Sequence, residues 1–294
     1  MLDREREALQ LYSRLCGGET DTPFTGVVGI TGNGKTALVQ AAARRYGWRF
    51  PDGVAYFSMR SEFSPTLIRD LFGGDQTARQ DADSPRETAL WLSKGRHLLI
   101  FDDLEEASAD TVGEVISLLA AWDTSLGGRA ILVTHTHRPE LQAIVGPNWL
   151  TVGQLPEDAA RTLLVSCLGG RDEASRIVGP DLPEVTQLCF WHPKTIESAA
   201  ALLQLGQRWE DLRDDLAKLS GQGPLGVNDE IMGRVLERLE QRVPIVRDLL
   251  DAWSVFGDRC HEMSWRVVAA GSSQSVAGLR SFHNAALTNC RAPA

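Results

Sequence analysis

The stretch GITGNGKTAL at residues 29–38 constrains the fold more than any other feature of this chain. It follows the apolar residues 26–28 and opens a helical pattern over residues 35–46. Gly29, four further residues and then Gly34, Lys35 and Thr36 match G-x-x-x-x-G-K-[ST], the loop that holds phosphates between a strand and a helix. At average glycine content the pattern should arise by chance in on the order of one chain per hundred of this length. The stretch therefore predicts a phosphate-binding loop rather than an ordinary turn.

The loop residues have distinct expected roles. Glycines let the backbone N–H groups close around a phosphate, and the first turn of the following helix adds its positive dipole end. Lys35 would supply a charge to the β- and γ-phosphates and is also assigned to catalysis, while the Thr36 hydroxyl would bind Mg²⁺. The expected nucleotide-binding residues of the loop are Gly29, Gly32, Asn33, Gly34, Lys35, Thr36 and Ala37.

The second part of the predicted site is the pair Asp102 and Asp103, which directly follows the apolar run at residues 97–101. Asp102 is expected to hold Mg²⁺ through water, and Asp103 to orient or deprotonate the attacking water. Taken alone, the two residues would read as a solvated acidic turn that continues into Glu105 and Glu106. Beside the loop with Lys35, a nucleoside-triphosphate site is the favoured interpretation.

A third part of the predicted site follows the apolar residues 130–133. Thr134 is expected at the carboxyl edge of the sheet, where ligands of open α/β sheets bind, and would contact the γ-phosphate or the attacking water. His135 and His137 frame Thr136 in an HTH triplet. Two histidines without further clustered ligands are more often ordinary loop residues, so we expect no metal besides Mg²⁺.

The order of apolar runs predicts an α/β fold, in which a parallel P-loop NTPase sheet carries helices on both faces. Strands are expected at residues 26–30, 54–59, 97–101 and 130–134, and helices at 35–46, 64–72, 85–94 and 110–121. Short helices follow at 156–168, 172–179, 182–190 and 194–205, and the Gly/Pro cluster GQGPLG at 221–226 precedes a longer pattern. The expected domains are 1–153 for nucleotide binding, 154–222 for a small all-α domain and 223–294 for a third unit.

Composition limits the classes of partner. The 294 residues carry a formal net charge of −9 and no run rich in Lys or Arg, so nucleic acid is expected to be an unlikely partner. No apolar run is long enough to span a bilayer, and the charged start is unlike a secretory signal, so a cytoplasmic location is expected. The five cysteines lie far apart without C-x-x-C pairs, which suggests neither zinc nor a disulfide framework.

Several segments, taken in order, resemble the NB-ARC branch of the STAND signal-transduction ATPases over roughly residues 1–260. They are DRE at 3–5, GITGNGKT, GVAYFSM, LLIFDD, ILVTHT, QLPEDAARTLL and CFWHPKTIESAAALL. The resemblance implies a P-loop domain, a helical domain and a winged helix, the last of which is only partial here. It also implies that the protein exchanges ADP for ATP with Mg²⁺ and oligomerises when ATP is bound to activate an effector.

The resemblance assigns three further residues. Leu2 and Arg4 are similar to the positions that contact adenine, and Pro193 is similar to the proline that packs on the nucleotide. By itself, Arg4 would instead belong to a solvated helix face, and Pro193 would simply begin a helix.

The chain departs from the family pattern at three places. Thr136 replaces the arginine of the γ-phosphate sensor, unless Arg138 reaches back to take its role. His192 and Lys194 replace the apolar residues beside the helical-domain proline. The winged-helix histidine that holds ADP has no counterpart, because the HEM triplet at 261–263 comes too early in the sequence.

The function expected from these features is an ATP/ADP-binding switch with slow hydrolysis, linked to effector or sensor partners. Three alternatives remain open: an ADP-binding regulatory or scaffold module without turnover, a nucleotide-regulated transcription regulator, and an AAA-type motor or loader. The last class usually has Glu where Asp103 stands.

Overall fold

The computed structural model describes residues 4–16, 22–61, 63–72 and 84–242. Its contacts divide the chain between Pro156 and Glu157 into two compact units, which are described separately here. Leu2, the HEM triplet at 261–263 and most of the expected winged-helix segment lie outside the described residues.

The first unit is built on a five-stranded parallel sheet with the strand order β2-β3-β4-β1-β5. Its strands are β1 (Phe24–Val28), β2 (Gly53–Ser58), β3 (His97–Asp102), β4 (Arg129–Thr134) and β5 (Trp149–Thr151). The four strands predicted from the sequence are all present. The edge strand β5 was not predicted, because three residues are too few to produce a periodic pattern.

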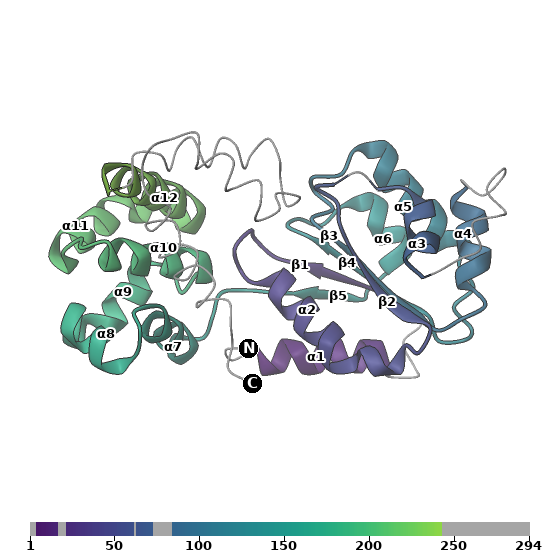
Figure 1. The fold of residues 1–294 in the computed structure, drawn as a ribbon, viewed down its shortest axis with the longest axis horizontal. Coiled ribbons are helices and arrows are strands. Elements are labelled where there is room, and N and C mark those ends of the chain that lie inside the picture. The colour runs from purple at the N-terminus through teal and green to yellow at the C-terminus, as the bar shows by residue number, and fades with distance from the viewer. Residues whose placement is uncertain (1–3, 17–21, 62, 73–83, 243–294) are drawn as a thin grey trace, which may run out of the picture. The chain divides into compact units, whose positions relative to one another are not determined.

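Helices cover both faces of the sheet (Figure 1). On one face, α1 (Glu5–Cys16) and α2 (Lys35–Tyr46) share a core with alternate strand residues such as Val27, Ile100 and Val133. On the other face, the intervening strand residues pack with α3 (Pro65–Leu71), α4 (Pro85–Leu92), α5 (Ala109–Ala121) and α6 (Pro139–Val145). The inner strands β1, β3 and β4 are buried on both faces, which explains their continuous apolar runs, and the predicted α/β class is confirmed.

Local sequence signals fix where several of these helices begin. Ser84 and Ser108 precede α4 and α5, and their hydroxyls accept hydrogen bonds from Glu87 and Thr111 backbone N–H groups. Such caps satisfy N–H groups that have no partner within the helix. Helices α3, α4 and α6 each begin with a proline, whose fixed φ suits the first helical position.

The second unit, as far as it is described, is helical. It contains α7 (Glu157–Cys167), α8 (Arg171–Ile177), α9 (Leu182–Leu188), α10 (Pro193–Gln204), α11 (Trp209–Leu219) and α12 (Gly223–Arg242). The Gly/Pro cluster forms a short 3-10 turn, Ser220–Gln222, and the first turn of α12, which packs against α10. Gly223, where we expected the third unit to begin, is thus the first residue of α12. The third unit at 223–294 remains a prediction.

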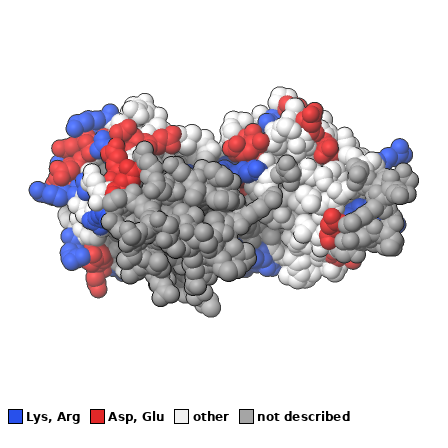
Figure 2. Space-filling view, turned by 45° about the horizontal axis from the view of Figure 1, so that its top comes forward, with Lys and Arg blue, Asp and Glu red and all other residues white. Residues whose placement is uncertain are grey.

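Charges on the second unit are mixed in sign. At the left of Figure 2, acidic and basic side chains lie next to one another over its helices. Arg234, for example, pairs with Asp215 on α11 and with Glu230 one turn away. In the described part of the chain, no helix is both long and apolar enough to cross a membrane. Cys16, Cys167 and Cys189 are free thiols.

Candidate functional site

The loop between β1 and α2 depends on glycine at three positions. Gly32 and Gly34 have φ values of 85° and 84°, in the left-handed region that side chains disfavour. Gly29 lies against the chain after β5, where an added Cβ would come within 2.3 Å of the Val152 carbonyl oxygen. The sequence pattern therefore corresponds to a turn that other residues could not form without a shift of the backbone.

The Lys35 ammonium lies folded over this loop. Its Nζ donates to the carbonyl oxygens of Gly29 at 2.7 Å and Ile30 at 3.3 Å, and the residue is buried. Burial lowers the pKa of Lys35, and nearby carboxylates, of which Glu105 has the largest effect, oppose that decrease. A desolvated cation beside a glycine turn and a helix N-terminus is an environment suited to a polyphosphate.

The strand order distinguishes this sheet from other nucleotide-binding α/β sheets. The loop leaves the carboxyl end of β1, and β4 separates β1 from β3, which ends at Asp102 and is followed by Asp103. This differs from the dinucleotide-binding and flavodoxin-like orders. The chain has the P-loop NTPase fold. Below, residues 29–36 are called the P-loop.

The other candidate residues of the loop and of the first turn of α2 differ in exposure. Thr36 is half-buried in the first turn of α2, and Ala37 is exposed beside it. Asn33 is buried; its Nδ2 donates to the Val152 carbonyl oxygen at 3.0 Å, and its Oδ1 has no hydrogen-bond partner among the described residues.

The oxygen donors near the P-loop fit Mg²⁺, which binds through few protein oxygens and several waters. The Thr36 hydroxyl and the Asp102 carboxylate are of the type that such a site needs. No group of three or more His, Cys, Asp or Glu side chains suited to a metal occurs among the described residues. Such a group is not needed by an ion that binds mainly to water and phosphate.

Asp102 is held rigidly at the end of β3. It is buried, its Oδ2 accepts from the Tyr56 hydroxyl at 2.7 Å, and its Oδ1 accepts from the Asp103 N–H at 2.9 Å. Burial and the bond to Asp102 raise the pKa of Tyr56. Tyr56 lies on the neighbouring strand β2. This contact links two strands, so sequence reasoning had no signal for it.

The Asp103 carboxylate points toward β2 and forms an ion pair with an arginine side chain. The residue's φ of 57° is left-handed, a conformation that aspartate tolerates better than most residues. The Arg60 Nε donates to Asp103 Oδ2 at 2.8 Å, and the bond raises the pKa of Arg60. Sequence reasoning missed Arg60, because a single arginine after a strand carries no pattern.

The segment after β4 brings other groups together. The Thr134 side chain, predicted to contact the γ-phosphate, is buried, and its hydroxyl donates to the Thr136 carbonyl oxygen at 3.2 Å. His135 Nδ1 lies 3.1 Å from Glu105 Oε1, and His137 packs against Trp149 with ring centroids 4.7 Å apart. The two histidines therefore have separate partners.

Arg4 binds backbone carbonyl groups around the P-loop. Its guanidinium donates to the carbonyl oxygens of Asn33 at 3.1 Å, Gly153 at 2.6 Å and Gln154 at 3.2 Å, and to Glu7 Oε1 at 2.9 Å. The residue is buried, unlike the solvated helix face that its charged neighbours suggested. Contact with adenine stays a proposal for Arg4, and Leu2 lies outside the described residues.

Pro193 occupies the first position of α10 in the helical unit. The His192 side chain caps that helix by accepting from the Thr195 N–H at 3.3 Å. Phe190 and Trp191, the two residues before His192, have φ values of 57° and 51°. Pro193 therefore begins a helix after a strained turn, and its contact with nucleotide stays a proposal.

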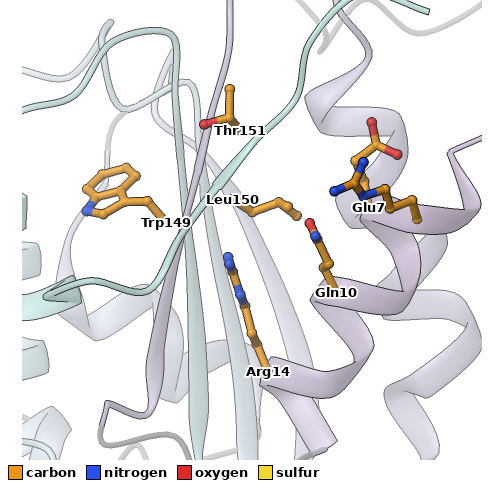
Figure 3. Close-up of a pocket in the computed structure, with 7 residues that line it drawn as sticks. Glu7, Gln10, Arg14, Trp149, Leu150 and Thr151 are labelled. Carbon is orange, nitrogen blue, oxygen red and sulfur yellow. The ribbon is translucent and has the colours of Figure 1, made fainter. Parts of the chain in front are cut away.

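A separate shallow cavity of about 340 Å³ lies between α1 and the edge strand β5 (Figure 3). Its lining is mostly polar, and every lining residue comes from these two elements. They are Arg6, Glu7, Gln10, Arg14, Trp149, Leu150 and Thr151. The cavity includes no P-loop residue and is distinct from the candidate nucleotide site.

Comparison with known proteins finds similar solved structures but no family. No family model matches the sequence, and no curated protein does. Among solved structures, the Orc1 protein of Aeropyrum pernix in complex with DNA gives a TM-score of 0.48 at 15% identity, over 74% of this chain and 66% of that chain. Cdc6p from Pyrobaculum aerophilum gives 0.47 at 12% identity, over 82% and 86%. Drosophila ORC bound to DNA gives 0.45 at 16% identity, over 99% and 83%.

These similarities concern the fold and do not single out the NB-ARC class. They also contradict one expectation from the sequence. Two of the similar structures are complexes with DNA, so our prediction that nucleic acid is an unlikely partner was wrong. The physical reason is that net charge averages over the whole surface, whereas nucleic acid responds to the local distribution of charge.

Proposed function

We propose that this protein binds ATP and ADP with Mg²⁺ and hydrolyses ATP slowly, and that the nucleotide state switches its conformation and assembly, as in the NB-ARC class. The observation that carries the proposal is the Lys35 ammonium, buried over a glycine turn and close to three carboxylates. A lysine in such a place is stabilised further when a polyphosphate replaces the loop carbonyls as its partner.

The proposed roles follow the geometry of the first unit. The P-loop N–H groups and Lys35 would hold the phosphates, and Thr36 and Asp102 would hold Mg²⁺. Asp103 is the group expected from the sequence to handle the attacking water. Its bond with Arg60 means that this role requires Arg60 to move aside.

Replacing Lys35 with alanine should weaken binding of both ATP and ADP by about tenfold or more, because a charge-assisted contact to phosphate is worth roughly 1.5 to 3 kcal/mol. Isothermal calorimetry on the purified chain measures the change. The matched control is Lys218→Ala, which removes a lysine whose side chain is 74% exposed on α11. Unchanged affinity in Lys35→Ala would reject the proposed nucleotide site.

The two aspartates should differ in their effect on binding. Asp102→Asn should weaken ATP binding in Mg²⁺ by about tenfold and have less effect in EDTA, because it removes a charge that holds the ion. Asp103→Asn should leave ATP binding within a factor of about three, because its carboxylate is bound to Arg60 and the pair is partly exposed. Equal losses in two correctly folded variants would contradict this assignment.

Measuring ATP hydrolysis distinguishes the proposed switch from a nucleotide-binding scaffold without turnover. A nucleotide-binding scaffold would retain affinity for ATP and ADP without releasing phosphate. A switch of the proposed kind should release phosphate slowly, and light scattering should detect larger assemblies with ATP than with ADP.

A further inference from the structure

Glu105 lies on a different side of the β3 terminus from Asp103. The N–H of Leu104 donates to the Val133 carbonyl oxygen at 3.1 Å, and the Leu104 side chain is fully buried. This bond directs the chain after Asp103 toward β4, while the Asp103 carboxylate contacts Arg60 beyond β2.

The strand order determines which of these sides lies closer to the P-loop. β4 pairs with β1 in parallel, so Val28 at the end of β1 lies opposite Thr134 at the end of β4. β2 is separated from β1 by two strands. A carboxylate at the end of β4 is therefore next to the start of the P-loop, whereas one turned toward β2 points away from it. Glu105 also has the largest effect of the three carboxylates on Lys35.

The two carboxylate oxygens of Glu105 have different surroundings. Oε1 lies 3.1 Å from His135 Nδ1, and the side chain is only 11% exposed. Oε2 is buried and has no hydrogen-bond partner among the described residues. A buried carboxylate oxygen without a donor is costly, so this atom is suited to accept a proton or a hydrogen bond from a bound molecule.

We propose that Glu105 is the general base for ATP hydrolysis and that His135 positions it. This inference rests on the proposed function and assigns the role first expected of Asp103 to a different carboxylate. The oxygen of water forms a bond to the γ-phosphorus of ATP, and Glu105 Oε2 accepts a proton from that water. The bond from the γ-phosphorus to the β–γ bridging oxygen breaks, and its electron pair leaves on ADP. The products are ADP and inorganic phosphate.

The first test is single-turnover hydrolysis of radiolabelled ATP by three variants. Glu105→Gln should lose turnover by about 100-fold or more, since general base catalysis contributes roughly 10² to 10⁴ in rate. Glu106→Gln is the matched control, because it removes an adjacent, exposed carboxylate and should remain near wild type. Asp103→Asn should lose much less than Glu105→Gln. The reverse order of Asp103→Asn and Glu105→Gln would overturn the inference.

A second test does not depend on turnover. Removing a buried like charge beside the γ-phosphate position should tighten binding of an ATP analogue with a non-cleavable β–γ bridge by about fivefold, with a smaller change for ADP. Glu105→Gln is compared with Glu106→Gln by calorimetry. No gain for the analogue over ADP would place Glu105 away from the γ-phosphate and overturn the proposal.

The two tests distinguish failure of the inference from failure of the function. If wild-type protein binds neither ATP nor ADP, the proposed function itself is wrong. If it binds both and Glu105→Gln changes neither turnover nor the preference for the ATP analogue, only the assignment of Glu105 is wrong.

His135 is tested as a positioning residue. His135→Asn retains a side-chain N–H that can reach Glu105, whereas His135→Leu cannot donate. The leucine variant should lower kcat with KM nearly unchanged, and the asparagine variant should restore much of the loss. Equal kcat in both variants and wild type would show that Glu105 does not depend on this contact.

Discussion

Phe101→Ala should lower the free energy of unfolding of the nucleotide-binding unit by about 3 to 5 kcal/mol, the largest loss of stability that we expect from a single core substitution. Phe101 is fully buried on β3, with the Phe57 ring stacked at 5.7 Å and the Phe63 ring edge-on at 5.6 Å. Alanine would remove both ring contacts and leave a cavity. Thermal denaturation followed by circular dichroism should show a decrease in Tm of roughly 10 °C.

Phe101→Leu is the matched control for this prediction. Leucine retains most of the apolar volume, so it should cost clearly less than alanine, about 1 to 2 kcal/mol. Because Asp102 follows Phe101 directly, we also expect Phe101→Ala to weaken Mg²⁺-dependent nucleotide binding. Equal Tm values for the two variants would mean that the ring packing adds little to stability.

Arg4→Ala should also have a large effect, lowering the free energy of unfolding by roughly 3 kcal/mol or more. The variant leaves the carbonyl groups of Asn33, Gly153 and Gln154 without the charged donor that binds them. Since one of these carbonyls belongs to the P-loop, nucleotide affinity should decrease as well. Chemical denaturation and calorimetry measure the two effects.

Two variants make the Arg4 prediction specific. Arg4→Lys keeps the charge but not the planar, five-donor guanidinium, so it should recover only part of the stability. Arg6→Ala removes an exposed arginine from the same helix and should cost less than about 0.5 kcal/mol. If Arg4→Ala lowered nucleotide affinity and left stability unchanged, a direct contact with adenine would explain the result better than backbone support.

The outline of the first unit could be predicted because its signals are local. Apolar runs marked β1 to β4, and the helix expected at residues 85–94 corresponds to α4. The edge strand β5 produced no such signal. It forms because Gly26 and Val28 on β1 offer backbone partners to a short segment that is distant in sequence.

The acidic residues after β3 show the limit of sequence reasoning at the site. Four carboxylates lie within five positions, and the sequence suggested roles for only the first two, Asp102 and Asp103. The left-handed backbone at Asp103 and the hydrogen bond from the Leu104 N–H to the Val133 carbonyl oxygen turn the carboxylates of Asp103 and Glu105 toward different strands. Arg60 and His135, which bind them, are 43 and 30 positions away, so no local spacing in the sequence links these pairs.

The sequence by itself determined the P-loop, because the glycine spacing and the following lysine act through backbone angles and N–H groups within a few residues. It also determined the α/β class, because burial on both faces requires continuous apolar strands. Only the tertiary structure decided the partners of Arg4, Asp103 and Glu105, since these depend on which strand ends meet at the sheet edge. Hydrogen bonds and ion pairs between distant segments follow from strand order and packing, and no spacing within one segment encodes them.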